Sequence, residues 1–176
     1  MSGRVLGWLV GTVAILGLVA GLAGCGSGQI AQTAQMVSTA DGSSGSAGPI
    51  SVLNAQIAWS GPVRGDAVYQ PGQDAELQTT IANSGDTADR LTAVTSPVAR
   101  QVRITGRTLL APDESLVAGS PSALLPGAAG IRITLSELTE PVRAGLTYPV
   151  TFTFEQAGAV HLVLGVQNPP TPPERS

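Results

Sequence analysis

The chain has little of the side-chain chemistry that builds metal sites and active sites. Its 176 residues include one cysteine (Cys25), one histidine (His161), two methionines and no lysine. A single cysteine excludes a disulfide within the chain, and a structural zinc site takes about four ligands. A Ser-His-Asp arrangement would need His161 beside a serine and a buried acid, and no motif marks such a site. We therefore expect a non-catalytic protein without a cofactor; a hydrolase built around His161 stays open as the less favoured alternative.

The charge balance is acidic. Twelve Asp and Glu residues face nine arginines, and removal of the first 24 residues takes Arg4 away and leaves a net charge of −4. A basic stripe for nucleic acid is therefore excluded as a main function. Arg100, Arg103 and Arg107 lie close together in the sequence, and we interpret them as part of a solvated strand face.

The N-terminus has the pattern of a secretory signal. Arg4 precedes an uncharged apolar run from Val5 to Ala23, which is the order of parts in a signal peptide. The run ends in Leu22-Ala23-Gly24-Cys25, which resembles the lipobox of bacterial lipoproteins. There a peptidase cuts before the cysteine, whose sulfur carries a diacylglycerol with fatty acids such as palmitate. We predict a cleaved signal peptide at 1–24 and lipid attachment at Cys25, on the extracytoplasmic (periplasmic) face of the cell membrane.

An uncleaved membrane anchor is the alternative for the same run. Its length is close to the roughly 20 residues that span a bilayer, and small residues at helical spacing favour helix pairing in membranes. Glycine is equally ordinary in signal peptides, so the lipoprotein interpretation is preferred. The glycines concerned are Gly7, Gly11, Gly17 and Gly21.

Residues 25–49 have the composition of a linker. They are rich in Gly, Ser, Ala, Gln and Thr and show no apolar period. Such a segment buries too little surface to offset its ordering entropy, so a disordered tether is predicted. About 22 free residues give a root-mean-square reach of roughly 25 Å.

Residues 50–168 have the pattern of an all-β domain. Apolar and polar residues alternate from Thr147 to Phe154 and from Val160 to Val166, around the turn Gln156-Ala157-Gly158, which predicts a hairpin with one buried face. Several short strands without a helical period predict one antiparallel Greek-key β-sandwich. Residues 169–176 are rich in proline and are predicted to form a disordered tail. Further strands are predicted at 50–59, at 98–105, within 130–138, and on both sides of the turn at 83–86.

The same region contains six short motifs in order: Asn83-Ser84-Gly85, Asp89-Arg90-Leu91, Ser96-Pro97-Val98-Ala99, Ala118-Gly119, Pro126-Gly127 and Phe154-Glu155-Gln156-Ala157-Gly158. In their order and spacing they resemble the PCuAC-type extracytoplasmic copper chaperones, and within them the LpqE-like lipoprotein branch. The resemblance covers roughly residues 50–167 and implies a cupredoxin-like or immunoglobulin-like β-sandwich.

The chain departs from that family at the copper ligands. Family members hold Cu(I) with two histidines and methionines, including a His-x-Met pair after the Pro-Gly turn, and such ligands suit a soft ion. The resemblance places Thr105 and Arg132 at the two histidine positions and Thr134 at the methionine position. A guanidinium stays protonated and cannot bind a cation. We therefore predict that the metal site is lost.

Copper chaperones of this family deliver metal to the dicopper centre of a terminal oxidase. The resemblance therefore suggests an accessory or assembly component of a respiratory oxidase complex, held at the membrane by its lipid. A copper carrier that uses a different site is the alternative. His161 and Met36 are the remaining soft ligands after lipidation of Cys25, but Met36 lies in the tether, and His161 is expected on the exposed face of its strand.

Overall fold

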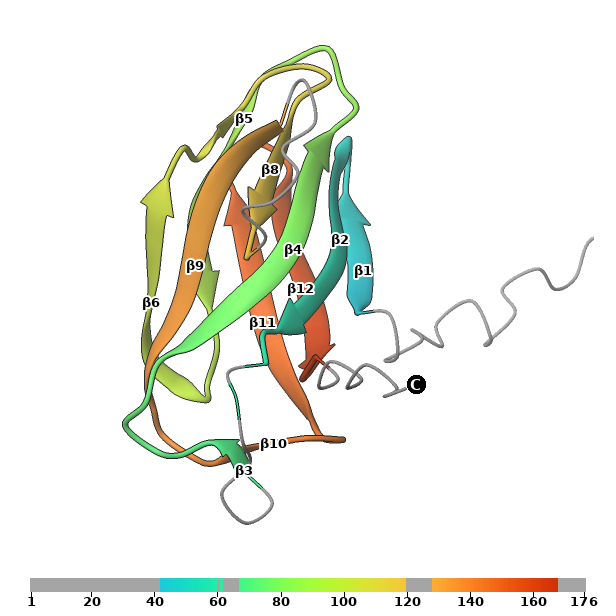
Figure 1. Cartoon of the computed structure of the whole chain (residues 1–176). Helices are drawn as coiled ribbons and strands as arrows, with labels where there is room; N and C mark the ends of the chain where they lie inside the picture. The colour runs from blue at the N-terminus through green and yellow to red at the C-terminus, as the bar shows by residue number, and fades with distance from the viewer. Residues whose placement is uncertain (1–41, 60, 62–66, 120–127, 168–176) are drawn as a thin grey trace, which may run out of the picture. The chain divides into compact units, whose positions relative to one another are not determined.

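The computed structural model describes residues 42–59, 61, 67–119 and 128–167. Within these ranges every regular element is a β-strand (Figure 1), and no helix there is long and apolar enough to cross a membrane. The predicted signal peptide (1–24), the lipid site at Cys25, Met36 and the tail at 169–176 lie outside the described residues.

The larger layer is a six-stranded sheet with the strand order β1-β2-β4-β8-β9-β6. Neighbouring strands are antiparallel except for β8 and β9, which are parallel. The strands are β1 (Ser43–Ala47), β2 (Ile50–Ile57), β4 (Ala75–Asn83), β8 (Ser115–Ala118), β9 (Ala128–Leu138) and β6 (Ala99–Gly106).

The second layer is a four-stranded antiparallel sheet in the order β12-β11-β5-β7. The chain changes layer between β4 and β5 and again between β5 and β6, so that the two sheets pack face to face as the predicted sandwich (Figure 1). A two-stranded pair, β10 with β3, is separate from both sheets. The strands are β12 (Gly158–Gly165), β11 (Thr147–Phe154), β5 (Asp89–Thr95), β7 (Leu109–Leu110), β10 (Val142–Arg143) and β3 (Ala67–Tyr69).

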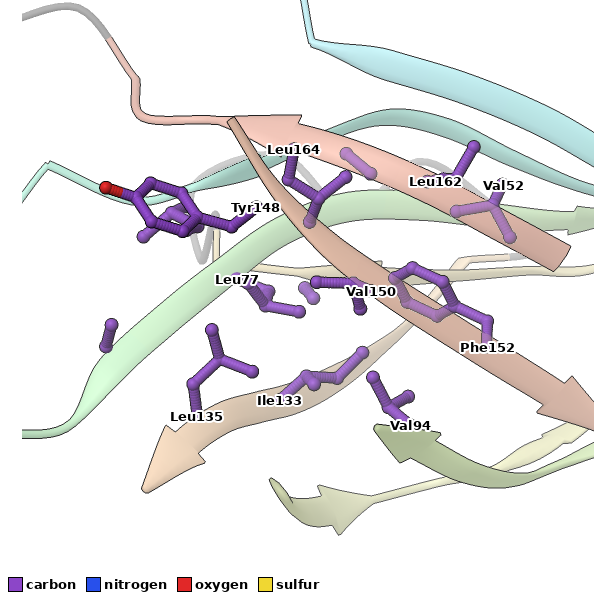
Figure 2. Close-up of a cluster of buried hydrophobic side chains, with 14 of the residues drawn as sticks. Val52, Leu77, Val94, Ile133, Leu135, Tyr148, Val150, Phe152, Leu162 and Leu164 are labelled. Atoms are coloured by element: carbon purple, nitrogen blue, oxygen red, sulfur yellow. The ribbon is translucent and has the colours of Figure 1, made fainter. Parts of the chain in front are cut away.

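The core lies between the two sheets and follows the alternation in the sequence. In β11 the side chains of Val150 and Phe152 are almost fully buried, at 1% and 0% exposure. Figure 2 shows them among Leu77 of β4 and Ile133 of β9, from the opposite sheet. The predicted hairpin is confirmed, with Phe154 paired to Gly158 around its turn.

The predicted tether is too long at its C-terminal end, because Ser43–Ala47 form strand β1 at the edge of the larger sheet. Glycine and serine allow this strand to lie close against β12. A Cβ atom at Gly45 would stand 2.8 Å from Leu162 Cδ2, and the buried Ser43 hydroxyl donates a hydrogen bond to the carbonyl of Val163. The sandwich therefore begins before residue 50, and a composition typical of a linker serves here for close packing.

Two buried polar residues connect the loops at one end of the sandwich. The Asn83 amide donates hydrogen bonds to the carbonyls of Thr87, Leu110 and Ala111 at 2.9–3.3 Å. Asp89 accepts hydrogen bonds from backbone N–H groups in the turn of the β11–β12 hairpin. Both residues belong to the motifs that carry the resemblance, and their hydrogen bonds connect the loops at this end of the sandwich.

Candidate functional site

The three positions at which the copper ligands are predicted to be lost lie together on the outer face of the six-stranded sheet. Thr105 of β6 is paired directly with Arg132 of β9, and Arg103 is paired with Thr134. Paired residues of antiparallel strands point to the same face, so these four side chains form a block of two by two. Arg103, Thr105 and Arg132 are exposed, and Thr134 is half-buried.

Arg132 has an acidic neighbour from a third strand. Glu76 of β4 is paired with Thr134, and its Oε1 lies 3.4 Å from Arg132 Nε. The two side chains are 50% and 70% exposed, so water and salt screen the ion pair and it contributes only about 0–1 kcal/mol. Arg132 is therefore free to exchange this partner for another anion.

The block presents hydroxyl and guanidinium groups, which are poor ligands for Cu(I). The described residues contain no cysteine or methionine, and their only histidine is His161. In the same part of the chain, no group of three or more His, Cys, Asp or Glu side chains is arranged to hold a metal ion.

His161 lies in the other sheet. It is exposed on the outer face of β12, opposite Thr151 of β11, and its Nδ1 lies 2.9 Å from Thr151 Oγ1. The expectation that it points away from the buried row of β12 is confirmed. A catalytic histidine of a Ser-His-Asp type has a carboxylate at this nitrogen, whereas here the partner is a hydroxyl.

Sequence reasoning identified three members of the block but missed the fourth, Arg103, and the neighbouring acid Glu76. Arg103 and Thr105 are two residues apart, which indicates a shared face once β6 is known to be a strand. Glu76 gave no such signal, because its place beside Arg132 depends on how β4 pairs with β9.

Comparison with known proteins identifies the family. A family model described as "Putative lipoprotein LpqE-like" matches residues 50–166. The protein of that name, LpqE, from Mycobacterium tuberculosis (strain ATCC 25618 / H37Rv) is 34% identical over 164 residues, which cover 88% of this chain and 86% of the relative. LpqE of Mycobacterium leprae (strain TN) is 31% identical over 170 residues, which cover 92% of this chain and 86% of the relative.

Solved structures share the fold. The "Copper-bound PCuAC domain from PmoF2" superposes with a TM-score of 0.54 at 23% identity and covers 72% of this chain and 99% of that domain. The "Apo PCuAC domain from PmoF1" gives 0.54 at 24% identity, covering 72% and 100%. The predicted all-β sandwich and the resemblance to PCuAC-type proteins are confirmed, and the chain belongs to the LpqE-like lipoprotein family.

Proposed function

We propose that this protein is a lipid-anchored, extracytoplasmic binding module that keeps the copper-chaperone fold without its copper site. The observation that carries the proposal is the block on β6 and β9, where Thr105, Arg132 and Thr134 stand together. A guanidinium in an ion pair at this place repels a metal cation. The module acts by binding another protein, without catalysis and without a cofactor.

The anchor is Cys25. The relatives carry the name lipoprotein, and Leu22-Ala23-Gly24-Cys25 closes an apolar run. The intact mass of the mature protein should therefore begin at Cys25 and include lipid, and Cys25→Ala should leave the precursor unprocessed. A mature N-terminus elsewhere, or an unmodified Cys25, would remove the anchor from the proposal.

The partner is a respiratory oxidase complex, on its extracytoplasmic side. Solved PCuAC domains share this fold, and a domain without the metal ligands can retain the rest of a docking surface. The chain between Cys25 and Gly42 spans at most about 60 Å when fully extended. The lipid therefore restricts the domain to the neighbourhood of the membrane and raises its effective concentration beside membrane complexes.

The docking surface includes Arg132, whose exposed guanidinium can exchange Glu76 for an acid of the partner. The test is affinity purification of the oxidase from wild-type cells and from cells with Arg132→Glu. Arg90→Glu is the matched control, because Arg90 is also an exposed arginine in an ion pair but belongs to the other sheet. We expect the protein to co-purify in the wild type and the control and to be depleted by Arg132→Glu.

Two negative results have different meanings. If the oxidase preparation from wild-type cells contains this protein only at background, the oxidase is not the partner. If both variants co-purify as well as the wild type, the oxidase remains the partner and the docking surface lies elsewhere.

A copper carrier is the second candidate, because one of the similar structures is a copper-bound domain. Such a carrier would need a site outside the block on β6 and β9. His161 is the only soft ligand among the described residues, so it is the ligand that this candidate would use from that part of the chain.

A further inference from the structure

The arginines of the described residues differ in how their charge is balanced. Most of them stand beside one acid each, in the ion pairs Arg90–Glu155, Arg100–Glu137, Arg107–Glu114 and Arg132–Glu76. Arg103 is exposed and forms no ion pair with any acid of the described residues. On the outer face of the larger sheet, this positive charge is therefore not balanced by an ion pair with any acid in the part of the chain that the structure describes.

Arg103 is a neighbour of Arg132. In the register of β6 and β9, Arg103 is opposite Thr134 and Thr105 is opposite Arg132, so the two arginines occupy one diagonal of the block and the two threonines occupy the other. Diagonal neighbours on adjacent strands are about 7–8 Å apart, within reach of long side chains. Figure 1 shows β6 and β9 side by side at the edge of the sheet. Among the described residues, Glu76 is the acid that forms an ion pair with Arg132.

We propose that Arg103, Thr105, Arg132 and Thr134 form a binding site for a phosphate-type oxyanion. Each guanidinium offers a planar fork of N–H donors that fits phosphate, and each threonine adds a hydroxyl donor. A bound anion also offsets the repulsion between the two guanidinium groups. The site goes beyond the proposed function and does not depend on the oxidase as partner.

Phosphate fits this block better than carboxylate. A carboxylate presents two oxygens in one plane, a geometry that matches the fork of a single guanidinium. A tetrahedral phosphate presents oxygens in several directions and can accept hydrogen bonds from both arginines and from the threonines between them. Because the block is exposed, we expect a dissociation constant of about 1–10 mM at low salt, and weaker binding as salt rises.

The experiment uses the mature lipidated protein in detergent and follows the Nε–Hε NMR signals of its arginines. Inorganic phosphate is added at constant ionic strength, with chloride and acetate as competing anions. The Arg103 and Arg132 signals should shift together and saturate with phosphate. The Arg90 signal, from an arginine in the other sheet, is the internal control and should stay in place.

Three substitutions make the test specific. Arg103→Gln and Arg132→Gln should each weaken phosphate binding by about fivefold, the effect of one exposed charge pair. Glu76→Gln should strengthen it by about two- to threefold, because it removes the acid that competes for Arg132. A substitution that merely disturbed the sheet would not improve binding.

A second part of the experiment distinguishes a lipid headgroup from free phosphate as the source of the bound group. The same protein is placed in nanodiscs of phosphatidylglycerol and in nanodiscs of a phosphate-free galactolipid. If the Arg103 and Arg132 signals shift in phosphatidylglycerol nanodiscs without added phosphate, and do not shift in galactolipid nanodiscs, the site binds lipid headgroups. If the signals shift in both kinds of nanodisc only after inorganic phosphate is added, the site binds the free ion. Equal shifts with chloride, or acetate bound as tightly as phosphate, would overturn the proposal.

Discussion

Replacement of Asp89 by asparagine tests how the resembling motifs hold the fold. Asp89 is 5% exposed. Its Oδ1 accepts hydrogen bonds from the backbone N–H groups of Arg90 at 2.7 Å and Gln156 at 3.0 Å, and its Oδ2 accepts one from Ala157 at 2.9 Å. Asp89 therefore connects the start of β5 to the turn of the β11–β12 hairpin.

Asparagine keeps one acceptor oxygen and places an NH₂ donor where the other oxygen was. In Asp89→Asn, at least one backbone N–H then faces a donor, and the remaining hydrogen bonds lose the assistance of the negative charge. Hydrogen bonds to charged groups contribute about 1.5–3 kcal/mol each, and a buried donor without a partner costs about 1–3 kcal/mol. We expect the free energy of unfolding at pH 7 to fall by about 2–4 kcal/mol.

The loss should depend on pH. Burial alone would raise the pKa of Asp89, but the N–H groups of Gln156, Ala157, Arg90 and Glu155 together hold that pKa below the usual value. A lowered folded-state pKa gives stability that is present above the unfolded pKa, about 3.9, and is lost as pH falls through the folded pKa. The difference between wild type and Asp89→Asn should therefore be largest near neutral pH and shrink below about pH 3.9.

Urea unfolding followed by the fluorescence of Trp59, which packs against the core, measures both effects. Asp86→Asn is the matched control, because Asp86 is exposed in the preceding turn, and it should change stability by less than about 0.5 kcal/mol. A loss for Asp89→Asn no larger than that of the control, or a difference that grows toward acid pH, would refute the reasoning.

Three further predictions concern stability in the same assay. Asn83→Ala should lower the free energy of unfolding by about 2–3 kcal/mol, because three carbonyls lose their hydrogen-bond donor. Ser84→Ala, at an exposed position, should lower it far less, and equal losses for the two variants would contradict this reasoning. Gly45→Val should cost about 1–3 kcal/mol by overpacking against Leu162, and an unchanged midpoint would show that β1 does not pack as described. A chain that lacks residues 42–49 should be at least about 2 kcal/mol less stable than one that keeps them, because the β12 side chains that β1 covers become exposed. Equal stability of the two chains would show that this segment is part of the tether and not of the folded domain.

The parts of the fold that the sequence predicted are those with a strong period. The β11–β12 hairpin alternates over its whole length, and its register agrees with that pattern. Strand β1 has no such period, because its close packing requires small residues, Ser43 and Gly45, where other strands have large apolar ones. The parallel pairing of β8 with β9 was also beyond prediction, since local residues do not specify the partner of a short strand.

The candidate site could also be predicted from the sequence only in part. The resemblance placed Thr105, Arg132 and Thr134 at related positions, and pairing of β6 with β9 brings them together. The fourth member, Arg103, and the neighbouring Glu76 set the electrostatics of the block, and strand register places both of them there. Strand register makes residues that are far apart in the sequence neighbours in space, and it cannot be predicted from a single sequence.

Titration of Cu(I) against a competing chelator tests the central claim that a copper-chaperone fold here has no copper site. We expect the wild-type protein to bind no Cu(I) more tightly than the chelator does. We also expect the combined substitutions Thr105→His, Arg132→His and Thr134→Met to create binding of one Cu(I) per chain, because they return soft ligands to positions that lie side by side. A wild-type chain that holds one Cu(I) tightly, and loses it on His161→Ala, would contradict the loss of the copper site.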